Sequence, residues 1–186
     1  MKAQFVLLLS AIAVIASSAS ATIKDRQTLL GGTVIRAGVA HTTELSDGEL
    51  DSLCNEGVTK AYYLYPGANA RTRSCGKGSI SYRSITWTDT TPILQSINSA
   101  LGNGTKVFIH CHNGAHATGY VAAIAMRQFC GFDGDQAMKY FDKTNKYGQP
   151  PAYTKIRNNL HSSLGSWWSA EAASRHHCAR SRNALR

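Results

Sequence analysis

Apolar and polar positions along the chain follow periods that are typical of strands and helices in turn. Short apolar or alternating segments predict strands at 33–38, 58–65, 79–87 and 107–110. Longer segments with helical periodicity predict helices that begin near Ser46, Thr91, Thr118, Asp133 and Tyr153. The segments 22–32 and 68–78 lack both periods and are predicted to be irregular. This order predicts an α/β domain with a small central, mostly parallel sheet and helices on both faces.

Capping signals define the ends of two helices. Ser46 and Glu49 have the spacing of a capping box, and we expect the helix that they begin to end near Gly57. Asp133 and Gln136 have the same spacing and begin a later helix.

Proline and glycine define further boundaries. Pro92 lies in the first turn of the helix that begins at Thr91, and Gly102 is expected to end that helix. The apolar helix after the central loop is predicted at 118–129, and the last helix is predicted to end at Gly165.

The first 21 residues have the pattern of a secretory signal peptide. Lys2 supplies the positive charge, 5–15 is the apolar core, and Ala19-Ser20-Ala21 is a small-residue cleavage site. A membrane span is the alternative, but the apolar core is too short and ends in serines. We therefore expect a secreted or periplasmic chain without a membrane span, with one domain at 22–165 and a basic tail at 166–186.

The chain is basic, with 20 lysines and arginines against 11 acidic residues. This balance favours a phosphorylated or other anionic ligand as the partner. Ordinary solubilising charge explains it equally well, because the basic residues are mostly scattered, and no nucleic-acid partner is expected. Asn103-Gly104-Thr105 is an N-glycosylation sequon, which is used only if the host glycosylates proteins.

Five cysteines leave one unpaired if the others form disulfides outside the cell. Setting Cys111 aside leaves four cysteines, which allow three connectivities. We favour Cys54–Cys75 and Cys130–Cys178, because each pair closes a local or terminal segment. Cys111 would then be a free thiol.

Cys111 lies between the predicted strand 107–110 and the helix that Thr118 begins. A cysteine in this position sits among unpaired backbone N–H groups, close to the positive end of a helix dipole. That geometry lowers the pKa of a thiol and can hold a tetrahedral anion. We expect the thiol to be partly exposed and reactive, and a buried structural cysteine is the alternative.

The order His110-Cys111, then Gly114, then Thr118-Gly119 resembles the signature of cysteine-dependent protein tyrosine and dual-specificity phosphatases, His-Cys-x-x-Gly-x-x-Arg-Ser/Thr-Gly. The resemblance implies that Cys111 is the nucleophile, that Thr118 helps the thiolate leave, and that His110 orders the loop. It further implies a substrate cradle made of His110, His112, Asn113, Gly114, Ala115, His116, Ala117 and Gly119. Over residues 33–164 the order of elements resembles the compact dual-specificity branch.

The chain departs from this signature at its arginine position, which holds Ala117. In the family that arginine grips the phosphoryl group through two parallel N–H bonds, which alanine cannot form. Arginines that serve phosphoryl transfer contribute about 10³–10⁵ in rate. Arg71, Arg73 and Arg127 are the candidate replacements by charge, and Arg127 is the weakest because it lies over two turns along the following helix.

Phosphatase chemistry also needs an acid that protonates the leaving oxygen. Asp89 follows a predicted strand and precedes a helix, on a loop comparable with the family's acid loop. It could equally cap the helix that begins at Thr91, and both interpretations stay open.

These observations leave three functional hypotheses. We favour a secreted pseudophosphatase, which keeps an oxyanion cradle but has weak or no catalytic activity. The alternative is an active cysteine phosphatase in which another basic residue replaces the arginine. A redox or zinc protein that uses Cys111, His112 and His116 is the third, but side chains of a phosphate loop point outward and would not converge on a metal. We expect neither a metal nor a cofactor.

Overall fold

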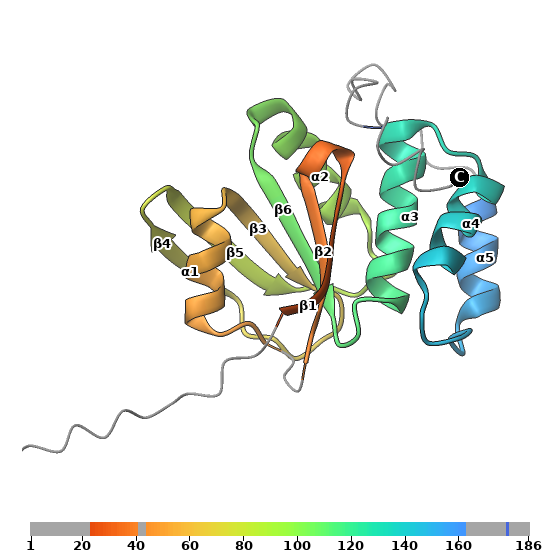
Figure 1. Cartoon of the computed structure of the whole chain (residues 1–186), viewed down its shortest axis with the longest axis horizontal. Coiled ribbons are helices and arrows are strands. Elements are labelled where there is room, and N and C mark those ends of the chain that lie inside the picture. Colours follow the sequence, from red (N-terminus) through yellow and green to blue (C-terminus); the bar gives the residue numbers. More distant parts are fainter. Residues whose placement is uncertain (1–22, 41–43, 163–177, 179–186) are drawn as a thin grey trace, which may run out of the picture.

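The structure is a computed structural model in which residues 23–40, 44–162 and 178 are described (Figure 1). The predicted signal peptide and the predicted basic tail, apart from Cys178, lie outside these residues. The strands are β1 (Ile23–Leu29), β2 (Val34–Val39), β3 (Val58–Tyr63), β4 (Arg71–Cys75), β5 (Gly78–Ser84) and β6 (Lys106–Cys111). The helices are α1 (Asp47–Asn55), α2 (Thr91–Asn103), α3 (His116–Cys130), α4 (Gly134–Thr144) and α5 (Tyr153–His161), with a 3₁₀ turn at Leu30–Gly32.

The strands form one sheet in the order β1-β2-β6-β3-β5-β4. The four inner strands β2, β6, β3 and β5 are parallel, and the edge strands β1 and β4 are antiparallel to their neighbours. The predicted small, mostly parallel sheet is therefore confirmed. Because the inner strands are parallel, their carboxyl ends and the loops that follow them lie at the same edge of the sheet.

Helices cover both faces of the sheet (Figure 1). On one face, α1 packs over β3, β4 and β5, and its core includes Leu50, Tyr82 and Phe108. On the other face, α2 and α3 pack on β6, and α4 and α5 add a further layer against α3. Both predicted capping boxes are confirmed, at Ser46 with Glu49 and at Asp133 with Gln136. Within the described residues, no helix has the length and apolar character needed to cross a bilayer.

The prediction that 22–32 and 68–78 are irregular is wrong over β1 and β4. Both are edge strands, and the side chains of β4 alternate only between partly and fully exposed. An edge strand is held mainly by backbone hydrogen bonds to one neighbour, so it needs no run of apolar residues. Polar strands of this kind carry no hydrophobic signal in the sequence.

Three helix boundaries differ from the predicted ones. The helix α2 continues to Asn103 and ends at Gly104, which has a left-handed backbone with φ 67°. The helix α3 begins at His116, two residues before the predicted start. The helix α5 ends at His161, and the predicted end at Gly165 lies outside the described residues.

Both predicted disulfides are present. Cys54–Cys75 joins α1 to β4 with a Cα–Cα distance of 6.1 Å, and Cys130–Cys178 joins the end of α3 to a residue of the tail at 5.5 Å. Cys111 is free, as predicted.

Candidate active site

The carboxyl edge of the parallel strands carries the predicted site. Cys111 is the last residue of β6, the second strand from one edge of the inner four, and α3 begins five residues later. Asp89 lies on the loop after β5, which ends at the same edge. Ligand sites of open parallel sheets lie outside the carboxyl ends of the strands. The fold therefore brings the loops of Asp89 and Cys111 to the place where such a site is expected.

The loop between β6 and α3 presents unpaired backbone donors. Among the described residues, no backbone N–H of residues 112–118 donates a hydrogen bond to another backbone group, and none is paired with a side chain. The first paired amide is that of Gly119, which donates to the carbonyl of Ala115 at 2.8 Å. These amides lie at the positive end of the α3 dipole. Such an arrangement favours a bound anion.

The loop backbone rests directly on the backbone of β2. A Cβ atom on Gly114 would lie 2.5 Å from the amide nitrogen of Gly38, and one on Gly38 would lie 2.7 Å from the carbonyl carbon of Asn113. Gly114 also has φ 68°, a left-handed conformation that side chains disfavour. Both glycines are therefore needed for this approach, and Gly38 was not among the residues singled out from the sequence.

Arg36, on the same strand as Gly38, also supports this loop. Its side chain is buried, and its Nη2 donates to the Gly114 carbonyl at 2.9 Å. Its guanidinium also lies over the Tyr140 ring, 6.0 Å from the centroid. No described carboxylate forms an ion pair with Arg36. Its positive charge therefore raises the electrostatic potential behind the loop. The sequence carried a signal for this residue, since it is an arginine within the apolar strand that begins Val34-Ile35.

The Cys111 thiol lies at the floor of the loop. The residue is only 3% exposed, and its Sγ is 3.7 Å from the Thr118 Oγ1. The prediction of a partly exposed thiol is therefore wrong. The side chain points toward the core that α3 covers, and Ala117 and Thr118 are buried in the first turn of that helix. The Thr118 hydroxyl therefore lies beside the sulfur, and its role in helping the thiolate leave stays a prediction.

His110 is a buried support beneath the loop. Its Nε2 is hydrogen-bonded to the Tyr82 hydroxyl at 2.9 Å, and its ring stacks on Tyr63 with a centroid distance of 5.0 Å. Its Nδ1 has no partner among the described residues. Burial lowers the pKa of His110 from 6.5 to about 3, so the ring is neutral at physiological pH. Because it is fully buried, it contributes to the cradle through packing and does not touch a ligand.

Asp89 is exposed, and its amide donates to the Thr86 carbonyl at 2.9 Å. The N-cap residue of α2 is Thr90, and no side chain forms a capping hydrogen bond there. The capping alternative for Asp89 is therefore not observed. Its role as a general acid stays a prediction.

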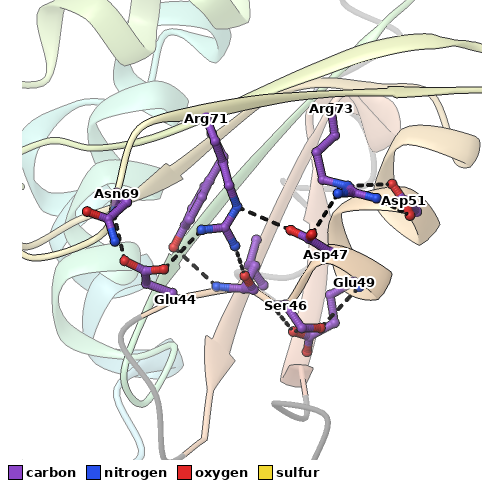
Figure 2. Close-up of polar contacts among 10 residues, drawn as sticks. Glu44, Ser46, Asp47, Glu49, Asp51, Asn69, Arg71 and Arg73 are labelled. Atoms are coloured by element: carbon purple, nitrogen blue, oxygen red, sulfur yellow. Dashed lines mark hydrogen bonds and ion pairs between the residues drawn. The ribbon is translucent and has the colours of Figure 1, made fainter. Parts of the chain in front are cut away.

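The arginines proposed as replacements are bound elsewhere. Figure 2 shows Arg71 and Arg73 turned toward carboxylates of α1 and of the loop before it. Arg71 pairs with Glu44 at 2.9 Å, and Arg73 pairs with Asp47 at 2.7 Å and with Asp51 at 2.8 Å. Arg127 donates to the carbonyl of the residue after α5. None of the three is therefore available to a ligand at Cys111.

A small apolar pocket adjoins Ala117. It has a volume of about 170 Å³, and its walls include Trp87, Pro151 and Ile156. His116 borders it and is hydrogen-bonded through Nε2 to the Gly148 carbonyl at 3.3 Å. His112 is exposed, and Asn113 is half-buried. Among the described residues, no three His, Cys, Asp or Glu side chains are grouped to hold a metal ion.

Comparison with known proteins identifies the fold. No protein-family model and no curated protein matches the chain. The solved structure of Tk-PTP in its active form is 15% identical, with a TM-score of 0.52 over 74% of this chain and 97% of that one. Human DUSP28 is 12% identical, with a TM-score of 0.53 over 77% and 97%. A mouse protein assigned to the dual specificity phosphatases, complexed with zinc tungstate, is 12% identical, with a TM-score of 0.51 over 79% and 92%.

These similarities show the fold of the chain. The chain has the α/β fold of the tyrosine and dual-specificity phosphatases, as the motif around Cys111 predicts. At this level of identity the similarity concerns the fold, and the function has to be argued from the site itself.

The contact between Gly38 and the loop predicts the effect of a single methyl group. Gly38→Ala should lower the free energy of unfolding by about 1–3 kcal/mol, because the added Cβ overlaps the loop backbone. Gly102→Ala is the control: its Cβ would meet nothing, and a helical alanine should stabilise by about 0.5–1 kcal/mol. Urea unfolding of both variants measures this. Equal stability of the two would show that the close approach is not present in solution.

The buried His110 predicts a loss of stability in mild acid. Between its usual pKa of 6.5 and its lowered pKa of about 3, the unfolded chain binds a proton that the folded chain does not. Stability should therefore fall with decreasing pH by about 1.4 kcal/mol per unit below pH 6.5. Urea unfolding from pH 7 to 5, where most carboxylates stay ionised, measures this effect. His110→Gln should remove the slope, and the exposed-site control His112→Gln should keep it. An unchanged slope in His110→Gln would show that His110 does not cause the pH dependence of stability.

Proposed function

We propose that the protein is a phosphatase-like binding protein, which holds phosphate or a similar oxyanion and hydrolyses phosphate esters weakly or not at all. The observation that carries the proposal is the loop after Cys111, where the backbone N–H groups of residues 112–118 are unpaired among the described residues. A phosphoryl group offers three acceptor oxygens for donors of this kind.

Two further features favour anion binding by this loop. The first is the N-terminus of α3, a 15-residue helix whose dipole is directed at the loop. The second is the guanidinium of Arg36, which touches the Gly114 carbonyl and has no described carboxylate partner. Both act through charge and shape that exist before any ligand arrives, so they cost no reorganisation when the ligand binds.

Two features oppose efficient catalysis. Ala117 supplies no cation to the developing charge of the transition state, and the candidate arginines are paired with other groups. The Cys111 residue is also only 3% exposed, which restricts the approach of phosphorus to Sγ. Binding through backbone amides needs neither of these features. The geometry therefore separates anion binding from turnover, and it favours a pseudophosphatase over an active enzyme.

We also propose that the mature protein acts outside the cytosol, after removal of residues 1–21. The two disulfides are consistent with this location, because structural disulfides persist mainly in oxidising compartments. The domain at 22–165 would then be the working part, and the role of the tail at 166–186 stays open.

Restoring the arginine tests the proposal. Ala117→Arg should raise the hydrolysis of an aryl phosphate by about 10²–10⁴, because it adds the missing cation. The matched control is Ala117→Gln, which adds a side chain of similar polarity and no charge, and should leave the rate at the wild-type level. Initial rates across pH 5 to 8 measure both variants.

Cys111→Ser identifies the source of any activity. In the Ala117→Arg background it should abolish the gained turnover, because serine is a poor replacement for a thiolate nucleophile. In the wild-type chain it should change little. Robust wild-type hydrolysis that Cys111→Ser abolishes would overturn the proposal and establish an active enzyme.

A further inference from the structure

One strip of the parallel sheet is left without a helix above it. Buried parallel strands normally have both faces covered. The helix α1 covers one face of β3 and β5, but on the opposite face α2 packs mainly on β6. The uncovered strip forms a groove of about 410 Å³ between α2 and the two strands. None of its lining residues belongs to the loop after Cys111, so the groove is separate from the candidate active site.

β3 and β5 form the floor of the groove, and their side chains on this uncovered face are mostly polar. Lys60 lies opposite Ser81, and Tyr62 lies opposite Arg83, in the parallel register of β3 and β5. The residue between Ser81 and Arg83, Tyr82, is buried under α1. The polar residues therefore alternate with core residues, and they face the groove because of the strand period.

A hydrogen bond joins the floor of the groove to its wall, and a cation–π contact lies within the floor. The Tyr62 hydroxyl is hydrogen-bonded to the Ser96 Oγ of α2 at 2.6 Å, and the Arg83 guanidinium lies over the Tyr62 ring, 5.4 Å from its centroid. Gln95 and Ser99 of α2 continue the polar wall. The groove thus presents a hydrogen-bonded tyrosine–serine pair and the exposed side chains of Gln95 and Ser99 beside two cations.

The charge of the groove is not neutralised by the described residues. No aspartate or glutamate lines it, and neither Lys60 nor Arg83 forms an ion pair with a described residue. On the neighbouring strand β4, in contrast, Arg71 and Arg73 are paired with acidic residues. The two cations of the groove are therefore available to an anionic ligand.

We propose that this groove binds a short anionic oligosaccharide, a ligand that carries negative charges together with many hydroxyl groups. Sulfate or carboxylate groups of the sugar would pair with Lys60 and Arg83, and its hydroxyls would bond to Gln95 and Ser99, which can both donate and accept. The volume of the groove falls in the range of sites for small organic ligands. An acidic peptide would meet the same two cations, but it offers the wall one N–H and one C=O per residue, whereas a sugar offers several hydroxyls per ring.

Calorimetric titration of the full chain tests the proposal with defined probes. A heparin-derived tetrasaccharide and a tetragalacturonate supply sulfate and carboxylate groups, and binding of either one supports an anionic sugar and shows which group is preferred. Maltotetraose, a neutral sugar of the same length, should bind at least tenfold more weakly than the better anionic probe. Tetra-aspartate should also bind at least tenfold more weakly, and equal binding of this peptide would overturn the choice of a sugar.

Charge-matched variants locate the site. Lys60→Ala with Arg83→Ala should weaken binding of the better anionic probe by roughly tenfold or more. Lys77→Ala with Lys139→Ala removes the same charge from exposed positions outside the groove and should change affinity less than threefold. All four residues are exposed, so the thermal midpoints should stay near that of the wild type. Equal weakening by both pairs, or no binding of either anionic probe, would overturn the proposal.

Discussion

The close approach of two backbones, at Gly38 on β2 and Gly114 in the loop after β6, is the constraint on which the rest of the site depends. It leaves no room for a Cβ atom on either residue. Arg36 reinforces it with a hydrogen bond from Nη2 to the Gly114 carbonyl. Arg36 thus holds the Gly114 carbonyl, while the N–H groups of 112–118 have no described partners. The anion cradle that we propose depends on how this loop packs against β2.

This arrangement separates two properties that a phosphatase combines. The cradle depends on backbone amides, the α3 dipole and a buried arginine, all of which are present. Turnover depends on an accessible thiol and a cation opposite the transition state. Cys111 is buried against Thr118, and position 117 is an alanine at the edge of an apolar pocket. The fold of a phosphatase is therefore compatible with a protein that retains its ligand without converting it.

Much of this could be predicted from local sequence patterns. Capping boxes and the strand before Cys111 were predicted because short-range spacing determines them. Both disulfide pairs were chosen from three connectivities because each pair closes a local or terminal segment. The edge strands β1 and β4 were missed, since polar strands bound on one side leave no hydrophobic pattern. The burial of the Cys111 thiol and the role of Gly38 could not be predicted, because they depend on packing between segments about 75 residues apart. Arg36 could have been noticed, because it is a charged residue in an otherwise apolar strand.

The most direct measurement of the central claim is an amide chemical-shift titration of the ¹⁵N-labelled protein with tungstate, repeated on Gly38→Ala. We expect the largest shifts on residues 112–118, where the unpaired amides lie, and we expect Gly38→Ala to lose them. Shifts spread over the basic surface, or an unchanged pattern in Gly38→Ala, would show that this loop does not hold the anion.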